Sequence, residues 1–192
     1  MGSSLIEPAV RPYCFTVEEY HRLGKAGVLQ EDDRVELLNG GIFTMSPIGS
    51  LHAGMLKRLN ELFHRKHRLE CVVAVQDPLH LDAHSEPQPD LMLLVPREDH
   101  YASAHPRPDD VLLLIEVADA SLDYDSGEKI PAYARAGIRE VWLIDVANRR
   151  LTLHRKPKPS GSYEQTLAVG PVDRFAPLAF PEATFTLADL GW

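Results

Sequence analysis

The sequence predicts an α/β fold with a mixed central β-sheet flanked by helices. Continuous apolar runs with polar boundaries are typical of strands covered on both faces, and such runs occur at residues 91–95 and 111–115. Residues 140–146 indicate the next buried strand along the chain after the one at 111–115. A helical segment separates the last two. Further short segments indicate antiparallel edge strands that close the sheet, at residues 150–154, 163–167 and 184–186. Residues 156–161 indicate a hairpin loop.

Length and composition indicate one globular domain. Of the 192 residues, 44% are hydrophobic and 25% are charged, which is enough for a single sizeable core. We take residues 1–14 as an N-terminal extension and residues 15–192 as the domain. The 20 basic and 28 acidic residues give a formal net charge of −8, which argues against a protein that coats nucleic acid by bulk charge alone.

From the sequence we expect neither a targeting signal nor a membrane anchor. Residues 1–12 lack the apolar region of a signal peptide, and no stretch approaches the roughly 18 to 20 apolar residues that span a bilayer. Cys14 and Cys71 have no C-x-x-C spacing, so neither a disulfide framework nor a zinc knuckle is indicated. We therefore expect a cytoplasmic protein with no membrane association.

Two local patterns predict the N-terminal elements. Thr16 and Glu19 have the spacing of a capping box, which predicts a short helix after them. The Asn39-Gly40 pair supplies the positive backbone angles of a tight turn and predicts a β-hairpin over residues 34–45. Glu36 lies on the first strand of this hairpin.

A basic amphipathic helix is predicted to begin at Ser50. Its apolar stripe consists of Leu51, Met55, Leu59 and Leu62, and its basic residues are Lys57, Arg58, Arg65, Lys66 and Arg68. The basic side chains form either the solvated face of a core helix or a contact with a nucleic-acid backbone. His64 and His67 lack a third ligand at a recognisable spacing, so we expect them to be solvated, as we do His52, for which a phosphate contact is the alternative.

The strand at residues 111–115 leads into the most informative part of the chain. Glu116 interrupts an apolar run, and a buried carboxylate must have a cation or hydrogen-bond donors to offset its desolvation. In the helix that follows, Asp125, Lys129 and Tyr133 recur every four residues and so share one face. Pro131 lacks an N–H group, which predicts a kink or an irregular start in this helix.

Three carboxylates stand at strand positions beside apolar neighbours, namely Glu36, Asp90 and Glu116. Carboxylates that converge from strand ends suit Mg²⁺ or Mn²⁺, because these hard ions take oxygen ligands and keep several waters. Lys129, on the next helix, has the chemistry to orient or polarise an attacking water, and the ion would neutralise charge that builds on a phosphate.

The sequence resembles the Uma2 family of restriction-endonuclease-like proteins, also called DUF820, over roughly residues 15 to 155. The resemblance rests on several short motifs: Val35-Glu36-Leu37-Leu38-Asn39-Gly40, Ser46-Pro47, Gln76-Asp77-Pro78, Pro89-Asp90-Leu91, Glu116-Val117-Ala118-Asp119-Ala120-Ser121, Asp125-Ser126-Gly127-Glu128-Lys129, Tyr133-Ala134-Arg135-Ala136-Gly137 and Val141-Trp142-Leu143-Ile144-Asp145. It implies a restriction-endonuclease-like fold of the PD-(D/E)xK superfamily.

The resemblance also implies Mg²⁺-dependent or Mn²⁺-dependent hydrolysis of phosphodiester bonds, with DNA as the substrate and a homodimer left open. It maps Asp90 and Glu116 onto the metal ligands and Glu36 onto an extra acid. Ala118 stands where the superfamily has its lysine, and the Uma2 pattern places a lysine on the next helix instead, here Lys129. An alternative is a catalytically silent protein that acts as a nucleic-acid-binding or protein-interaction module.

The same residues also have structural interpretations. Asp90 after Pro89 fits a strand-end aspartate, and Glu36 fits a charge pair across its hairpin. Glu116 and Lys129 fit a buried ion pair without any metal, and Lys129 with Tyr133 fits a solvated helix face. The carboxylates and Lys129 would then be a structural ion network, in the least favoured case within a dimerising protein.

Overall fold

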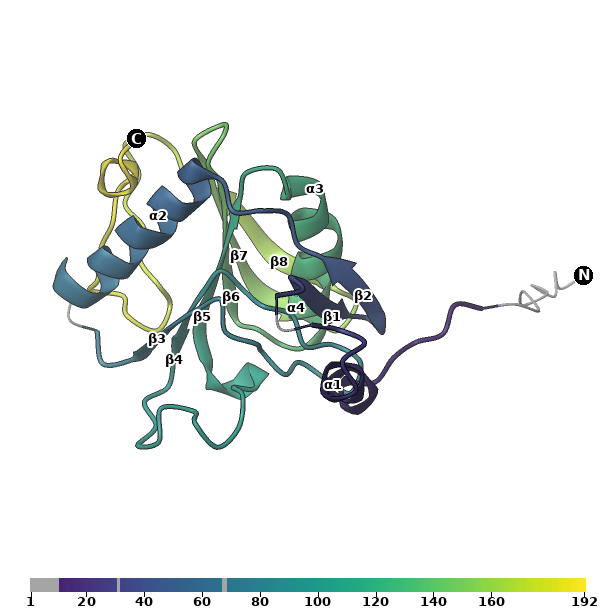
Figure 1. The fold of residues 1–192 in the computed structure, drawn as a ribbon. Helices are drawn as coiled ribbons and strands as arrows, with labels where there is room; N and C mark the ends of the chain where they lie inside the picture. Colours follow the sequence, from purple (N-terminus) through teal and green to yellow (C-terminus); the bar gives the residue numbers. More distant parts are fainter. Residues whose placement is uncertain (1–10, 31, 67–68) are drawn as a thin grey trace, which may run out of the picture.

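The computed structural model describes residues 11–30, 32–66 and 69–192. Its strands are Val35–Leu38 (β1), Gly41–Thr44 (β2), Val72–Val75 (β3), Leu91–Leu94 (β4), Val111–Ala118 (β5), Glu140–Asp145 (β6), Arg150–Lys158 (β7) and Ser162–Ala168 (β8). The last six form one sheet in the order β3-β4-β5-β6-β7-β8, and β1 pairs with β2 in a separate hairpin (Figure 1). Within the larger sheet β5 and β6 are parallel and the other neighbours are antiparallel. The predicted mixed α/β fold is confirmed.

Short helices connect and cover these strands. The α-helices are Val17–Lys25 (α1), Ser50–Glu61 (α2), Leu122–Tyr124 (α3) and Ile130–Arg135 (α4). Two π-helical turns follow α2 and α3, at Leu62–Lys66 (η1) and Asp125–Lys129 (η3), and 3₁₀ turns form at Pro108–Asp110 (η2) and Leu187–Leu190 (η4). No helix in the described ranges is long and apolar enough to cross a membrane.

The local signals at the N-terminal end are confirmed. Thr16 and Glu19 form the reciprocal hydrogen bonds of a capping box at the start of α1. Asn39 and Gly40 have φ angles of 50° and 77°, as a tight hairpin turn between β1 and β2 requires. Of the predicted N-terminal extension at residues 1–14, the first ten residues lie outside the described part of the chain.

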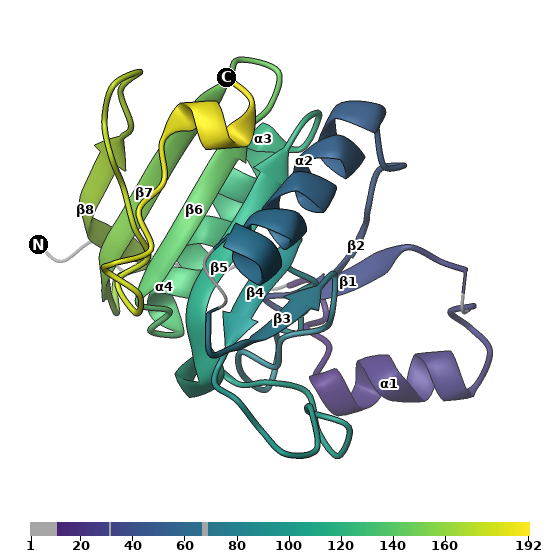
Figure 2. The same ribbon diagram turned by 90° about the vertical axis from the view of Figure 1, so that its left-hand side faces the viewer.

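Each face of the six-stranded sheet has its own apolar cluster. On one face, α2 and the C-terminal segment pack over the sheet, whereas α3 and α4 lie on the other face (Figures 1 and 2). Along β5 the side chains alternate, so Leu113, Ile115 and Val117 join the α2 face. Leu114 and Ala118 join the α4 face, and Glu116 lies between them in the alternation. A two-residue period therefore directs Glu116 away from α2.

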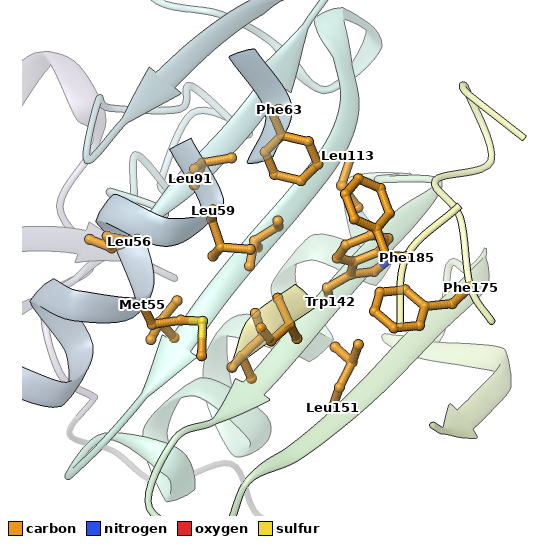
Figure 3. Packing of buried hydrophobic residues seen from close by; sticks show 14 of the residues in the cluster. Met55, Leu56, Leu59, Phe63, Leu91, Leu113, Trp142, Leu151, Phe175 and Phe185 are labelled. Atoms are coloured by element: carbon orange, nitrogen blue, oxygen red, sulfur yellow. The ribbon is translucent and has the colours of Figure 1, made fainter. Parts of the chain in front are cut away.

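Aromatic packing organises the α2 face. Phe63, just after α2, contacts Phe185 with ring centroids 5.6 Å apart, and Trp142 of β6 contacts Phe175 at 5.2 Å (Figure 3). Phe175 and Phe185 are joined by one isolated β-bridge. The predicted strand at residues 184–186 is therefore wrong, because packing on Trp142 rather than a strand ladder holds this segment in place.

Two further details differ from the sequence interpretation. Strand β7 continues through Lys158, so the loop predicted at residues 156–161 shortens to the turn before Ser162. Leu51, expected in the apolar stripe of α2, is 58% exposed, and Leu56 is buried in its place. The helix face that the sheet covers is therefore rotated toward Leu56 from the face that the sequence pattern suggested.

Candidate active site

The register of β4 and β5 brings Asp90 and Glu116 together. Leu91 pairs with Ile115 across this antiparallel pair, and one further step of the register sets Asp90 opposite Glu116. The backbone N–H of Val117 donates to Asp90 Oδ2 at 2.8 Å. Both carboxylates consequently lie on the α4 face of the sheet, as a shared site requires.

The hairpin and the helical segment bring Glu36 and Lys129 to the same place. Lys129 Nζ lies 3.3 Å from Glu36 Oε2 and 3.2 Å from Glu116 Oε1, and all three side chains are buried. Glu36 also accepts a hydrogen bond from the backbone N–H of Gln88 at 2.8 Å. Its neighbour across the hairpin is Phe43, so Glu36 does not pair across its own hairpin.

The helix that carries Lys129 is irregular at the position that Pro131 predicts. The π-helical turn η3 ends directly before α4, and the N–H of Ile130 donates to the carbonyl of Asp125 five residues earlier. Pro131 occupies the first turn of α4, where its missing N–H is tolerated. Lys129 and Tyr133 are buried along with Asp125, so the solvated-face interpretation of this helix is wrong.

Two polar side chains hold Asp90 that the sequence did not single out for this role. His52 Nε2, on the first turn of α2, lies 2.8 Å from Asp90 Oδ1, and the Gln76 side-chain amide donates to the same oxygen at 3.3 Å. His52 is largely buried, contrary to the expected solvation. Gln76 has a positive φ of 57°, an uncommon conformation for a non-glycine residue and one that recurs at functional sites.

The contact between His52 and Asp90 shifts the pKa of both side chains. Burial alone would raise the pKa of Asp90, but the hydrogen bond and charge of His52 hold it below its ordinary value. The hydrogen bond to Asp90 in turn raises the pKa of His52, against the effect of burial. Asp90 is therefore an ionised carboxylate beside an imidazole that favours its charged form.

The pKa of Glu116 is shifted in the opposite direction to that of Asp90. Burial, together with the nearby charges of Asp125 and Asp90, raises the pKa of the Glu116 carboxyl well above its ordinary value, despite the opposing charge of Lys129. Burial alone would lower the pKa of Lys129, but the charges of Glu116 and Glu36 raise it. The single positive charge of Lys129 is therefore shared between the carboxylates of Glu36 and Glu116 and cannot neutralise both.

The four candidate catalytic residues that the sequence suggests all border one cavity of about 480 Å³; they are Glu36, Asp90, Glu116 and Lys129. Its ionisable lining comprises five acids and three bases, namely Glu36, Asp90, Glu116, Asp119, Asp125, Arg34, His52 and Lys129. Its remaining walls come from residues 44–49 together with Gln76, Gln88, Ala120, Ser121 and Tyr124. The cavity is therefore acidic, and a small cationic ligand would relieve its excess negative charge.

The donor chemistry of the cavity suits a hard divalent cation. Its acids supply carboxylate oxygens, and Glu36 Oε1 is buried with no hydrogen-bond partner among the described residues. Within those same residues, no three acidic, histidine or cysteine side chains already stand in a coordinating arrangement. Lys129 is the cation that contacts both Glu36 and Glu116.

The basic helix contributes less than its composition suggested. Lys57, Arg58 and His64 are exposed. The side chains of Arg65, Lys66, His67 and Arg68 lie outside what the structure describes.

Ala118, which stands where the superfamily has its lysine, is fully buried on the same face as Glu116. Its small side chain is compatible with the approach of Lys129 from the helix.

Comparisons with known proteins show the family and the fold of the chain. The sequence matches the Uma2 family, described as "Putative restriction endonuclease", over residues 17–188. A crystal structure titled as a "putative nuclease belonging to DUF820" from Anabaena variabilis superposes with a TM-score of 0.69 at 15% identity, covering 92% of this chain and 97% of that one. No curated protein matches the sequence.

Proposed function

Because the chain belongs to the Uma2 family, we propose that it is a metal-dependent nuclease that hydrolyses phosphodiester bonds of DNA in the acidic cavity. One observation carries the proposal: Glu36 of β1, Asp90 just before β4, Glu116 of β5 and Lys129 of η3 are far apart in the sequence and all line the same cavity. Strand and helix positions that converge in this way are typical of a site rather than of a surface charge network.

Asp90, Glu116 and Glu36 would hold Mg²⁺ or Mn²⁺, and the ion would neutralise charge on the phosphate and activate water. The roles of the protein groups follow from their contacts. His52 and Gln76 fix the orientation of Asp90. Lys129 contacts the carboxylate of Glu116 and borders the cavity, where an ammonium group can orient water and interact with a phosphate oxygen.

A second candidate function rests on one specific observation. Lys129 already pairs with both Glu36 and Glu116, which is also what a structural ion network would do. In that case the protein is a catalytically silent member of the family that binds nucleic acid or another protein. The position of Glu36, Glu116 and Lys129 in the wall of a cavity favours the nuclease, because a network that served only stability would need no space beside it.

Plasmid cleavage with defined variants separates the two functions. We expect the wild type to nick supercoiled plasmid with Mg²⁺ or Mn²⁺, and Glu116→Gln to lose both Mn²⁺ binding and nicking. Lys129→Ala should bind Mn²⁺ and lose nicking by orders of magnitude, since the lysine acts on water and phosphate.

The matched control for Lys129→Ala is Lys156→Ala. Lys156 Nζ also lies 3.2 Å from a glutamate oxygen, that of Glu164, but both side chains are more than half exposed. Its removal should leave nicking unchanged. An inert wild type with every divalent ion, combined with metal-independent destabilisation by Glu116→Gln and Lys129→Ala, would contradict the nuclease and support the silent network.

A further inference from the structure

We propose that Tyr133 is a positioning residue that fixes the Glu116 carboxylate for metal binding from behind the cavity. The inference rests on the proposed function, because it takes Glu116 to be a metal ligand. Tyr133 lies on α4 and is fully buried, and its hydroxyl donates to Glu116 Oε1 at 2.5 Å.

Tyr133 reaches Glu116 from the core rather than from the cavity. Glu116 borders the cavity, whereas Tyr133 is absent from its walls and belongs to the apolar cluster on the α4 face. A substrate in the cavity therefore meets Glu116 and not Tyr133. Any effect of Tyr133 on metal or substrate must pass through the carboxylate that it holds.

The hydrogen bond supplies what Lys129 cannot. Lys129 divides its charge between Glu36 and Glu116, and an ammonium group is a point charge on a flexible stem that does not fix the plane of a carboxylate. The tyrosine hydroxyl is carried on a rigid ring within a packed core, so its direction is fixed. Both contacts fall on Oε1, so neither of them engages Oε2, and the direction of the hydroxyl fixes the plane in which Oε2 lies.

A second tyrosine provides a matched control. Tyr163 of β8 belongs to the same apolar cluster, is also buried, and its hydroxyl donates to the carbonyl of Ile138 at 2.9 Å. Tyr133→Phe and Tyr163→Phe each remove one buried hydroxyl and one hydrogen bond. They differ in whether the acceptor is Glu116 or the backbone carbonyl of a residue outside the cavity lining.

The experiment is calorimetric titration of Mn²⁺ into the wild type and the two variants, with a thermal melt of each. Loss of a hydrogen bond that orients a metal ligand typically weakens metal affinity by about 10- to 100-fold, and we expect this for Tyr133→Phe alone. Loss of one buried hydrogen bond lowers Tm by about 2–4 °C in a protein of this size, and we expect this for both variants.

Equal Mn²⁺ affinity of Tyr133→Phe and wild type, with only Tm lowered, would show that Tyr133 is structural and would overturn the inference while leaving the nuclease proposal intact. A wild type that binds no Mn²⁺ would overturn both. If Tyr133→Phe does not fold, the wild type carrying 3-fluorotyrosine at position 133 tests the contact by ¹⁹F NMR. Saturating Mg²⁺ should shift that resonance but not one at position 163, and an unshifted resonance at 133 would overturn the inference.

Discussion

Two buried glutamates on opposite faces of the same sheet show different ways to stabilise a carboxylate. Glu140, on the face covered by α2 and the C-terminal segment, accepts from Arg155 Nη2 at 2.6 Å, from the Trp142 indole at 2.9 Å and from the backbone of Leu178 at 2.6 Å. Its acceptors are saturated by the residues that pack around it. Glu140 thereby fastens the C-terminal segment to the sheet.

Glu116, on the α4 face, has fewer hydrogen-bond donors than Glu140 and shares its cation. It has the hydroxyl of Tyr133 and a lysine that it shares with Glu36, and its pKa is raised well above the ordinary value by burial and by the neighbouring acids Asp125 and Asp90. Glu116 itself lines the cavity of about 480 Å³, whereas Glu140 stands behind its partners Arg155 and Leu178, which line a second pocket of about 520 Å³. The difference teaches that an acid short of positive charge beside a cavity is arranged for a ligand, and a saturated one for stability.

The largest effect on stability should come from the saturated acid. Arg155→Met leaves Glu140 buried without its cation, and breaking a buried ion pair in this way costs about 3–5 kcal/mol. Urea unfolding would measure the loss, and Mn²⁺ affinity should not change. A loss below about 1 kcal/mol, as for a surface pair, would remove the distinction between the two acids.

Glu116→Gln should have the opposite pattern. The amide keeps the shape of the side chain and relieves the crowding of negative charge, so the unfolding free energy of the metal-free protein should be unchanged or higher by about 1 kcal/mol. Mn²⁺ binding should be lost. Urea unfolding and calorimetry on the same sample would test both, and a destabilisation comparable to that of Arg155→Met would mark Glu116 as structural.

The pH dependence of stability should also distinguish the acids. Because the folded pKa of Glu116 lies above its ordinary value of 4.5, the folded state binds more protons than the unfolded state between these two pKa values. This contribution to stability is fully present below pH 4.5 and is lost as pH rises through the folded pKa. Metal-free Glu116→Gln should lack that decline in urea unfolding across pH, and an identical pH profile of wild type and variant would contradict the raised pKa.

The smallest expected effect concerns η3, the π-helical turn that ends at Lys129. Pro131→Ala restores an N–H group and frees the unfolded chain, which should lower the unfolding free energy by about 0.4–1 kcal/mol. Because η3 can then relax toward a regular helix, plasmid nicking should fall while Mn²⁺ affinity stays constant. Unchanged nicking would mean that the irregular turn does not depend on Pro131.

Strong local signals explain why so much of the fold and site could be predicted. The apolar runs define β4, β5 and β6, and a carboxylate inside such a run, as at Glu116, already requires a partner. The helical spacing of Asp125, Lys129 and Tyr133 predicted that they share a face. The structure places Glu36, Asp90, Glu116 and Lys129 around one cavity, while their catalytic and metal-binding roles stay predictions.

The remainder depends on tertiary packing that leaves no local pattern. Nothing in the sequence near His52 or Gln76 indicates a contact with Asp90, since these residues meet only when α2, β3 and β4 assemble. The hydroxyl of Tyr133 shares a helix face with Lys129, but its acceptor could be identified only from the sheet register. The strand predicted at residues 184–186 does not form, because this segment is held in place by Phe175 and Phe185 packing on Trp142.

The most direct test of the claim that the α4 face holds a cation site is the anomalous difference density of a crystal soaked in Mn²⁺. We predict a peak in the cavity, with carboxylate oxygens of Asp90 and Glu116 at about 2.0–2.2 Å from the ion, as expected for a small hard cation. Glu140 should show no peak. An empty cavity in the soaked crystal, with Lys129 still paired to both Glu36 and Glu116, would contradict the account and identify the cluster as a second structural ion network.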